Sequence, residues 1–125
     1  MRKSQNPKSE PNLSRVSLGS SGEAAAARWY ESAGYEVLER NWRCREGEID
    51  LIARNADTLI FCEVKTRANA VFGSPVEAVG WAKQSRLRRL AVAYLASRSG
   101  SFMPLLRFDI AAVVGGRVQV YEDAF

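Results

Sequence analysis

The stretch that decides the fold is Gly47-Glu48-Ile49-Asp50-Leu51-Ile52-Ala53-Arg54-Asn55-Ala56-Asp57-Thr58-Leu59-Ile60-Phe61-Cys62-Glu63-Val64-Lys65-Thr66. Its two apolar runs predict β-strands over residues 48–54 and 58–66, and Asn55-Ala56-Asp57 between them predicts a turn. The second run is apolar almost without interruption, which is typical of a central strand buried on both faces. A sheet built around this hairpin therefore forms the middle of the predicted fold.

Helices and further strands are predicted on both sides of this hairpin. Ser20 and Glu23 have the spacing of a capping box, and Ser74 and Glu77 repeat it before a second helix. The predicted elements outside the hairpin are a helix over 20–33, a strand over 35–42, a helix from 74 to about 97 with a break near Gly80, and strands over 107–114 and 117–121. The order α-β-β-β-α-β-β predicts an α/β domain with a mixed sheet of about five strands flanked by helices.

Length and composition favour a single soluble domain. The chain has 125 residues, of which 46% are apolar and 26% charged. Residues 1–18 are polar and basic and predict a flexible N-terminal arm, so the domain itself is expected over 19–125. No apolar run approaches the length of a membrane span, and no secretory signal is evident at the start. With two cysteines and no disulfide framework, we expect a cytoplasmic protein without a membrane partner.

The absence of histidine excludes several classes of chemistry. The sequence contains no histidine and only two cysteines. Catalysis by a Ser-His-Asp or Cys-His group is therefore impossible, as is a zinc site built from histidine or from four cysteines. Acid–base or metal chemistry has to come from Asp, Glu, Lys, Tyr or Cys.

Charge is distributed unevenly along the chain. Residues 81–98 contain five basic residues and no acidic one, whereas residues 19–80 contain more acidic than basic residues. A basic block is typical of a protein that binds a polyanion, and acidic residues beside it are typical of a bound cation. The alternative for the basic block is a solvated helix face.

The strongest candidate site is formed by Asp50, Glu63 and Lys65. Side chains alternate along a strand, so Glu63 and Lys65 point to one face, and the hairpin places Asp50 within a residue or two of Glu63. Buried charges are costly unless they are compensated, and two adjacent carboxylates repel each other. A divalent cation resolves this, and Mg²⁺ (with Mn²⁺ as an alternative) suits carboxylate ligands. An ion pair on an exposed edge is the competing interpretation.

Three further residues have both a functional and a structural interpretation. Glu23 is either a third acid of the site or the closing residue of its capping box. Glu48 alternates with Asp50 along one strand face, so it is a candidate for an outer carboxylate. Gln84, near the start of the basic helix, either orients a water or phosphate or is solvated.

Several motifs together resemble a known family. They are Gly22-Glu23-Ala24, Asn41-Trp42-Arg43, the segments 47–52 and 61–67, and Arg107-Phe108-Asp109. They are similar to the YraN-type family of small bacterial proteins over about residues 20–121. The resemblance implies a restriction-endonuclease-like fold, similar to archaeal Holliday-junction resolvases.

The residues of that fold's PD-(D/E)xK signature can be identified by the same resemblance. The signature is matched by Asp50, Glu63 and Lys65, with Ile49 in place of the signature's proline. Glu23 corresponds to the resolvases' helical acid, and Gln84 to a glutamine of their second helix.

The resulting expectation is a Mg²⁺-dependent nuclease, a structure-specific endonuclease acting on DNA rather than RNA. Asp50 and Glu63 would hold the metal with the Val64 carbonyl, and Lys65 would position or deprotonate the attacking water. The expected nucleic-acid contacts are Lys83, Gln84, Arg86, Arg88, Arg89 and Arg67. The alternatives are a non-catalytic nucleic-acid-binding module that retains the fold, and a scaffold protein without nucleic-acid affinity. The oligomeric state stays open, a homodimer included.

Overall fold

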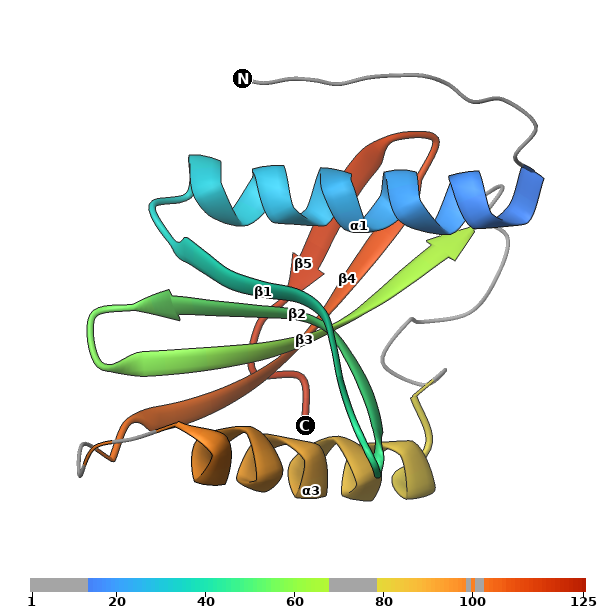
Figure 1. The fold of residues 1–125 in the computed structure, drawn as a ribbon. Helices are drawn as coiled ribbons and strands as arrows, with labels where there is room; N and C mark the ends of the chain where they lie inside the picture. Colours follow the sequence, from blue (N-terminus) through green and yellow to red (C-terminus); the bar gives the residue numbers. More distant parts are fainter. Residues whose placement is uncertain (1–13, 68–78, 99, 101–102) are drawn as a thin grey trace.

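The computed structural model describes residues 14–67, 79–98, 100 and 103–125, with the backbone alone for 14–20. Within these residues a five-stranded sheet lies between two helices (Figure 1). The elements are α1 (Ser14–Ser32), β1 (Glu36–Cys44), β2 (Gly47–Asn55), β3 (Thr58–Arg67), α3 (Trp81–Ser97), β4 (Leu105–Val114) and β5 (Arg117–Tyr121). The predicted order and the single α/β domain are confirmed.

The sheet is mixed, as predicted, and its strands lie in chain order β1-β2-β3-β4-β5. Neighbouring strands are antiparallel except β3 and β4, which are parallel. A parallel connection needs a long crossover, and the chain segment containing α3 provides it. The crossover leaves β3 at the centre of the sheet and takes α3 to the face opposite α1.

The core consists of two apolar clusters, one on each face of the sheet. On the α3 face, Leu59 and Phe61 of β3 pack with Leu90 of the helix. On the α1 face, the alternating residues Ile60 and Cys62 pack in the second cluster. The central strand is therefore buried on both faces, which confirms the interpretation of its apolar run. Neither helix of the described residues combines the length and apolar character that a bilayer span requires.

The helix starts differ from the predictions. α1 begins at Ser14 and continues through Gly19 and Gly22, since each glycine inside a helix costs only about 1 kcal/mol. Ser20 is consequently an interior residue, and the predicted capping box at Ser20 and Glu23 is wrong. Residues 14–18, assigned to the arm, are helical, and 1–13 lie outside the described residues. α3 begins at Trp81 after the N-cap Gly80, and the capping box predicted over 74–77 also lies outside them.

Candidate metal centre

The candidate site lies where β2 and β3 separate. Their pairing runs from Asn55 and Thr58 at the turn to Leu51 and Cys62. Beyond that point the first half of β2 bends towards α3, whereas the end of β3 continues towards α1 (Figure 1). Asp50 is the next residue on one side of this opening.

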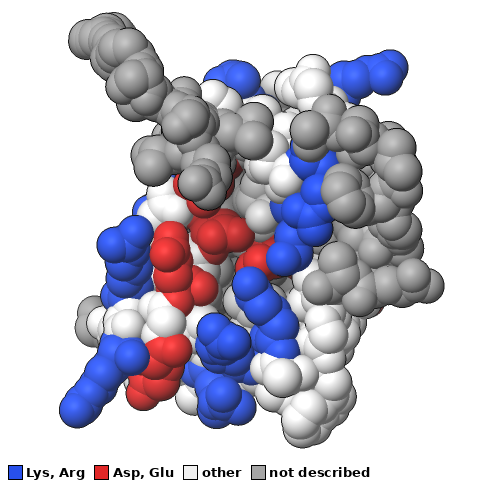
Figure 2. Space-filling view, turned by 90° about the vertical axis from the view of Figure 1, so that its right-hand side faces the viewer, with Lys and Arg blue, Asp and Glu red and all other residues white. Residues whose placement is uncertain are grey.

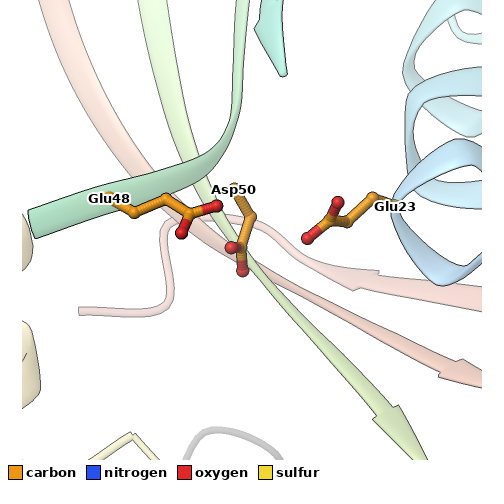
Figure 3. A group of neighbouring side chains, drawn as sticks. All are labelled: Glu23, Glu48 and Asp50. Carbon is orange, nitrogen blue, oxygen red and sulfur yellow. The ribbon is translucent and has the colours of Figure 1, made fainter. Parts of the chain in front are cut away.

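Three carboxylates meet at the opening. Asp50 and Glu48 come from alternate positions of β2, and Glu23 comes from α1 (Figure 3). One carboxylate oxygen from each residue lies within 4.8 Å of the other two, and all three residues are half-buried. The alternation of side chains along a strand places Glu48 and Asp50 on one side, and the helix above supplies the third acid. An all-oxygen cluster of this kind has the donor atoms that Mg²⁺ or Mn²⁺ uses.

Glu63 lies beside this cluster and is paired with two lysines. Its residue exposure is only 5%. Its Oε2 lies 2.8 Å from Nζ of Lys83, which reaches over from α3, and 3.5 Å from Nζ of Lys65 on the same strand. The shared orientation of Glu63 and Lys65 predicted from strand alternation is confirmed, and the buried carboxylate is compensated from two sides.

The electrostatic environment of Asp50 is strongly perturbed. Burial raises its pKa from 3.8 to about 7, and the neighbouring charge of Glu63 adds to this increase. The backbone N–H of Val64 donates a hydrogen bond of 2.8 Å to Asp50 Oδ2, which lowers the pKa and offsets part of the effect. The buried, acid-rich surroundings therefore disfavour the ionised form of Asp50.

The predicted acidic residues do not all occupy the positions expected from the sequence. Asp50 and Glu23 come together as expected, and Glu48, predicted as an outer residue, is a full member of the group. Glu63 is adjacent to Asp50 but pairs with lysines. Val64, predicted to offer its carbonyl, contacts Asp50 through its N–H. The i, i+2 spacing of Glu48 and Asp50 was the signal for their shared role.

The basic residues predicted to contact phosphate occupy different environments. Lys83 pairs with Glu63, and Gln84 Nε2 donates to the Val79 carbonyl at 2.8 Å.

The arginines differ from one another as well. Arg88 lies over the Phe108 ring, 5.0 Å from its centroid. Arg67 Nη1 donates to the Thr66 carbonyl at 3.2 Å. Arg86 and Arg89 are exposed on α3.

Acidic and basic side chains are grouped on one face of the protein. On one face of the molecule, acidic side chains gather near the centre, and lysines and arginines border them (Figure 2). Such an arrangement suits a cation held between acids and an anion held around them.

A close approach between α1 and β3 fixes the position of Glu23. A Cβ on the preceding residue, Gly22, would overlap Oγ1 of Thr66 and would lie 3.3 Å from the Thr66 Cβ. Rotating the threonine side chain moves Oγ1 but leaves the Cβ in place. The missing side chain of Gly22 therefore lets the helix approach the end of β3.

Gly22→Ala is expected to destabilise the protein by about 1–3 kcal/mol, because overpacking forces the helix and strand apart. Thr66→Ala removes the overlapping oxygen, so the double variant should lose much less stability than the two single variants together predict. Urea denaturation of all four proteins measures this coupling. Strict additivity would show that Gly22 and Thr66 are not in close contact.

The raised pKa of Asp50 predicts a specific pH dependence. An acid whose folded pKa exceeds its unfolded value destabilises the fold when it ionises, so the loss begins above about pH 4 and is complete above about pH 7. Asp50→Asn cannot ionise. The stability of this variant relative to the parent should therefore rise between pH 5 and pH 8, as measured by urea denaturation with a metal chelator. Parallel pH profiles would contradict the prediction.

Comparisons with known proteins agree on one family. The model of the uncharacterised protein family UPF0102 matches residues 22–113. A UPF0102 protein of Nocardia farcinica is 51% identical over 100 residues, covering 80% of this chain and 78% of the relative. One of Rhodococcus jostii is 46% identical over 115 residues, covering 88% and 97%. The expected YraN-type family is thereby confirmed, and its name states no activity.

Proposed function

The chain belongs to the uncharacterised protein family UPF0102, and on that premise we propose that it is a metal-dependent nuclease. The observation that carries the proposal is the cluster of Glu23, Glu48 and Asp50 directly beside the Glu63–Lys65 pair. Carboxylates on two adjacent strands, with a lysine two residues after one of them, match the PD-(D/E)xK arrangement of restriction-endonuclease-like folds. We extend the proposal to that fold family and to its resolvase branch.

The residues present fit a Mg²⁺ ion. Asp50, together with Glu23 and Glu48, would hold it, and Glu63 is near enough to add its charge. The raised Asp50 pKa reflects burial and the neighbouring charge of Glu63, both of which disfavour the ionised carboxylate, whereas a bound cation would favour it. When bound, Mg²⁺ supplies Lewis acidity towards a phosphoryl oxygen and lowers the pKa of a bound water.

Lys65 is the residue best placed to act on the water. Its side chain is 21% exposed and its Nζ lies 3.5 Å from Glu63, so the amine sits at the edge of the opening. Its positive charge favours a hydroxide or a phosphate oxygen beside it, and it can hold the attacking oxygen in position.

Basic residues beyond the opening would hold the substrate backbone. α3 contributes Arg86 and Arg89 as exposed cations, and the segment that forms it contains no acidic residue. No groove-reading motif is evident, so we expect recognition of DNA structure rather than base sequence, with DNA preferred to RNA.

Cleavage of labelled DNA tests the proposal. Linear duplex, single-stranded, flapped and four-way DNA are incubated with the protein in Mg²⁺, in Mn²⁺ and in chelator. We expect cleavage of at least one substrate only with metal, and none by Asp50→Asn. Binding without cleavage by the parent would instead support a non-catalytic nucleic-acid-binding module.

The exposed arginines of α3 give a separate prediction. Arg86→Ala combined with Arg89→Ala should lower the slope of log K against log salt by about two units or less, since each lost phosphate contact contributes about one. Arg117→Ala, an exposed arginine of β5, is the matched control and should leave the slope unchanged. An unaltered slope in the double variant would identify this face of α3 as merely solvated.

A further inference from the structure

Trp81 is unusual among the tryptophans of this chain. It is 79% exposed, although tryptophan is highly buried on average in folded proteins. The rings of the other two pack edge to face, Trp29 on Tyr30 at 5.0 Å and Trp42 on Tyr94 at 5.2 Å. In the part of the chain that the structure describes, no aromatic or cation–π partner faces the Trp81 ring. Its indole is therefore offered to solvent.

The backbone around Trp81 is firmly anchored. Val79, two residues before it, is 1% exposed, and its carbonyl accepts the Gln84 side-chain bond of 2.8 Å. The Gln84 backbone N–H donates to Gly80 at 3.0 Å and closes the first helical turn. The backbone that presents the exposed ring is therefore already ordered, and only the rotamers of the ring itself are fixed when a flat ligand stacks on it.

The same helical turn connects Trp81 to the candidate metal centre. Lys83, two residues later, places its Nζ 2.8 Å from the Glu63 carboxylate. Further along the solvent side of the helix come the exposed Arg88 and Arg89. Trp81 thus lies at the start of a positively charged helix, on the side that it shares with Arg88, seven residues later, while Lys83 extends from the other side to the site.

An exposed aromatic ring within a basic surface is the combination that binds single-stranded nucleic acid. The bases of an intact duplex are already stacked on each other, whereas an unpaired base can stack on a side chain. We propose that Trp81 is a stacking platform for an unpaired DNA base at the start of this basic helix, so that DNA with a single-stranded segment binds more tightly than duplex. This inference rests on the proposed function for its polyanionic substrate. It adds that the substrate has a single-stranded segment.

Fluorescence anisotropy in chelator tests this without any cleavage. The probes are a labelled oligothymidine of about 16 nucleotides, the upper end of usual site sizes, and a duplex of the same length. Trp81→Ala should weaken binding of the single strand roughly 5- to 150-fold, the equivalent of one stacked base. Trp81→Phe should retain most of the affinity. Val92→Ala, which removes another exposed apolar side chain of α3, is the matched control and should have no effect.

Two further readouts separate stacking from other roles of Trp81. Duplex affinity should change less than twofold, and the salt slope should stay the same because no ionic contact is removed. Equal losses for both probes, no loss for either, or an equal loss in Val92→Ala would overturn the inference.

The outcomes also distinguish this inference from the nuclease proposal. A protein that never cleaves, yet loses single-strand binding in Trp81→Ala, supports the inference and refutes the nuclease. A protein that cleaves with metal while Trp81→Ala binds both probes like the parent overturns the inference alone.

Discussion

Lys65→Ala is expected to lower the rate of DNA cleavage at saturating Mg²⁺ by roughly 10²–10⁴-fold, the usual contribution of a group that orients or deprotonates the nucleophile. Metal and DNA affinity should stay close to those of the parent. The reason is geometric: Lys65 lies 3.5 Å from Glu63, whereas the shorter pairing of that carboxylate, 2.8 Å, is with Lys83. Single-turnover kinetics measures the step directly.

The presence of Lys83 beside Glu63 allows the effect of Lys65→Ala on cleavage to be interpreted. If Lys65 only compensated Glu63, its removal would leave Lys83 in place, and both fold and cleavage would be nearly normal. Lys83→Ala is the matched control, because it removes the closer ion-pair partner of a buried carboxylate and should mainly lower stability. A near-parental single-turnover rate for Lys65→Ala would remove that residue from the chemistry.

How far the sequence predicts this site depends on the range of each contact. Asp50 and Glu63 are neighbours because a short hairpin joins their strands, and alternation along one strand orients Glu63 and Lys65 to the same face. Both relations follow from local geometry, so the sequence was sufficient to predict them. The pairing of Glu63 with Lys83 depends on where the crossover helix lies, and no local pattern specifies that. Glu48 was predicted only as an outer carboxylate because its spacing from Asp50 indicates which side of the strand it faces but not how near α1 approaches.

The elements of the fold likewise divide into those that local sequence predicts and those that neighbouring structure determines. The apolar run of β3 correctly predicted a strand buried on both faces, since it reflects the environment of that strand itself. The start of α1 was misplaced because the Ser20 and Glu23 pattern is a local signal, and the helix continues through it. Helix ends depend on small propensity differences, so neighbouring structure easily shifts them.

A buried carboxylate beneath α1 is the feature that sequence patterns could least reveal. Asp109, on β4, is fully buried. It accepts hydrogen bonds from the Tyr30 hydroxyl at 2.6 Å, from Arg107 Nε and Nη2 at 2.9 Å each, and from the Asp123 N–H at 3.0 Å. Tyr30 lies 79 residues away in the chain, so only the folded structure brings these groups together.

This network fixes α1 to the sheet. Hydrogen bonding to Asp109 raises the pKa of Arg107 and keeps the guanidinium charged, while burial raises the pKa of Tyr30 and keeps its hydroxyl a donor. Both oxygens of the carboxylate are satisfied, so its burial is fully compensated. Because Tyr30 and Glu23 belong to the same helix, the network also supports the acid that α1 contributes to the metal centre.

Asp109→Ala is therefore expected to destabilise the protein by about 3–5 kcal/mol, because Tyr30 and Arg107 lose their partner in a buried environment. Urea denaturation measures this. Glu122→Ala is the matched control: it removes the other carboxylate near Arg107, at 3.8 Å and 49% side-chain exposure, and should cost less than about 1 kcal/mol. Tyr30→Phe, which removes a single donor, should cost about 1–3 kcal/mol and stays measurable if Asp109→Ala does not fold. Equal effects of Asp109→Ala and Glu122→Ala would show that the buried network does not hold α1 in place.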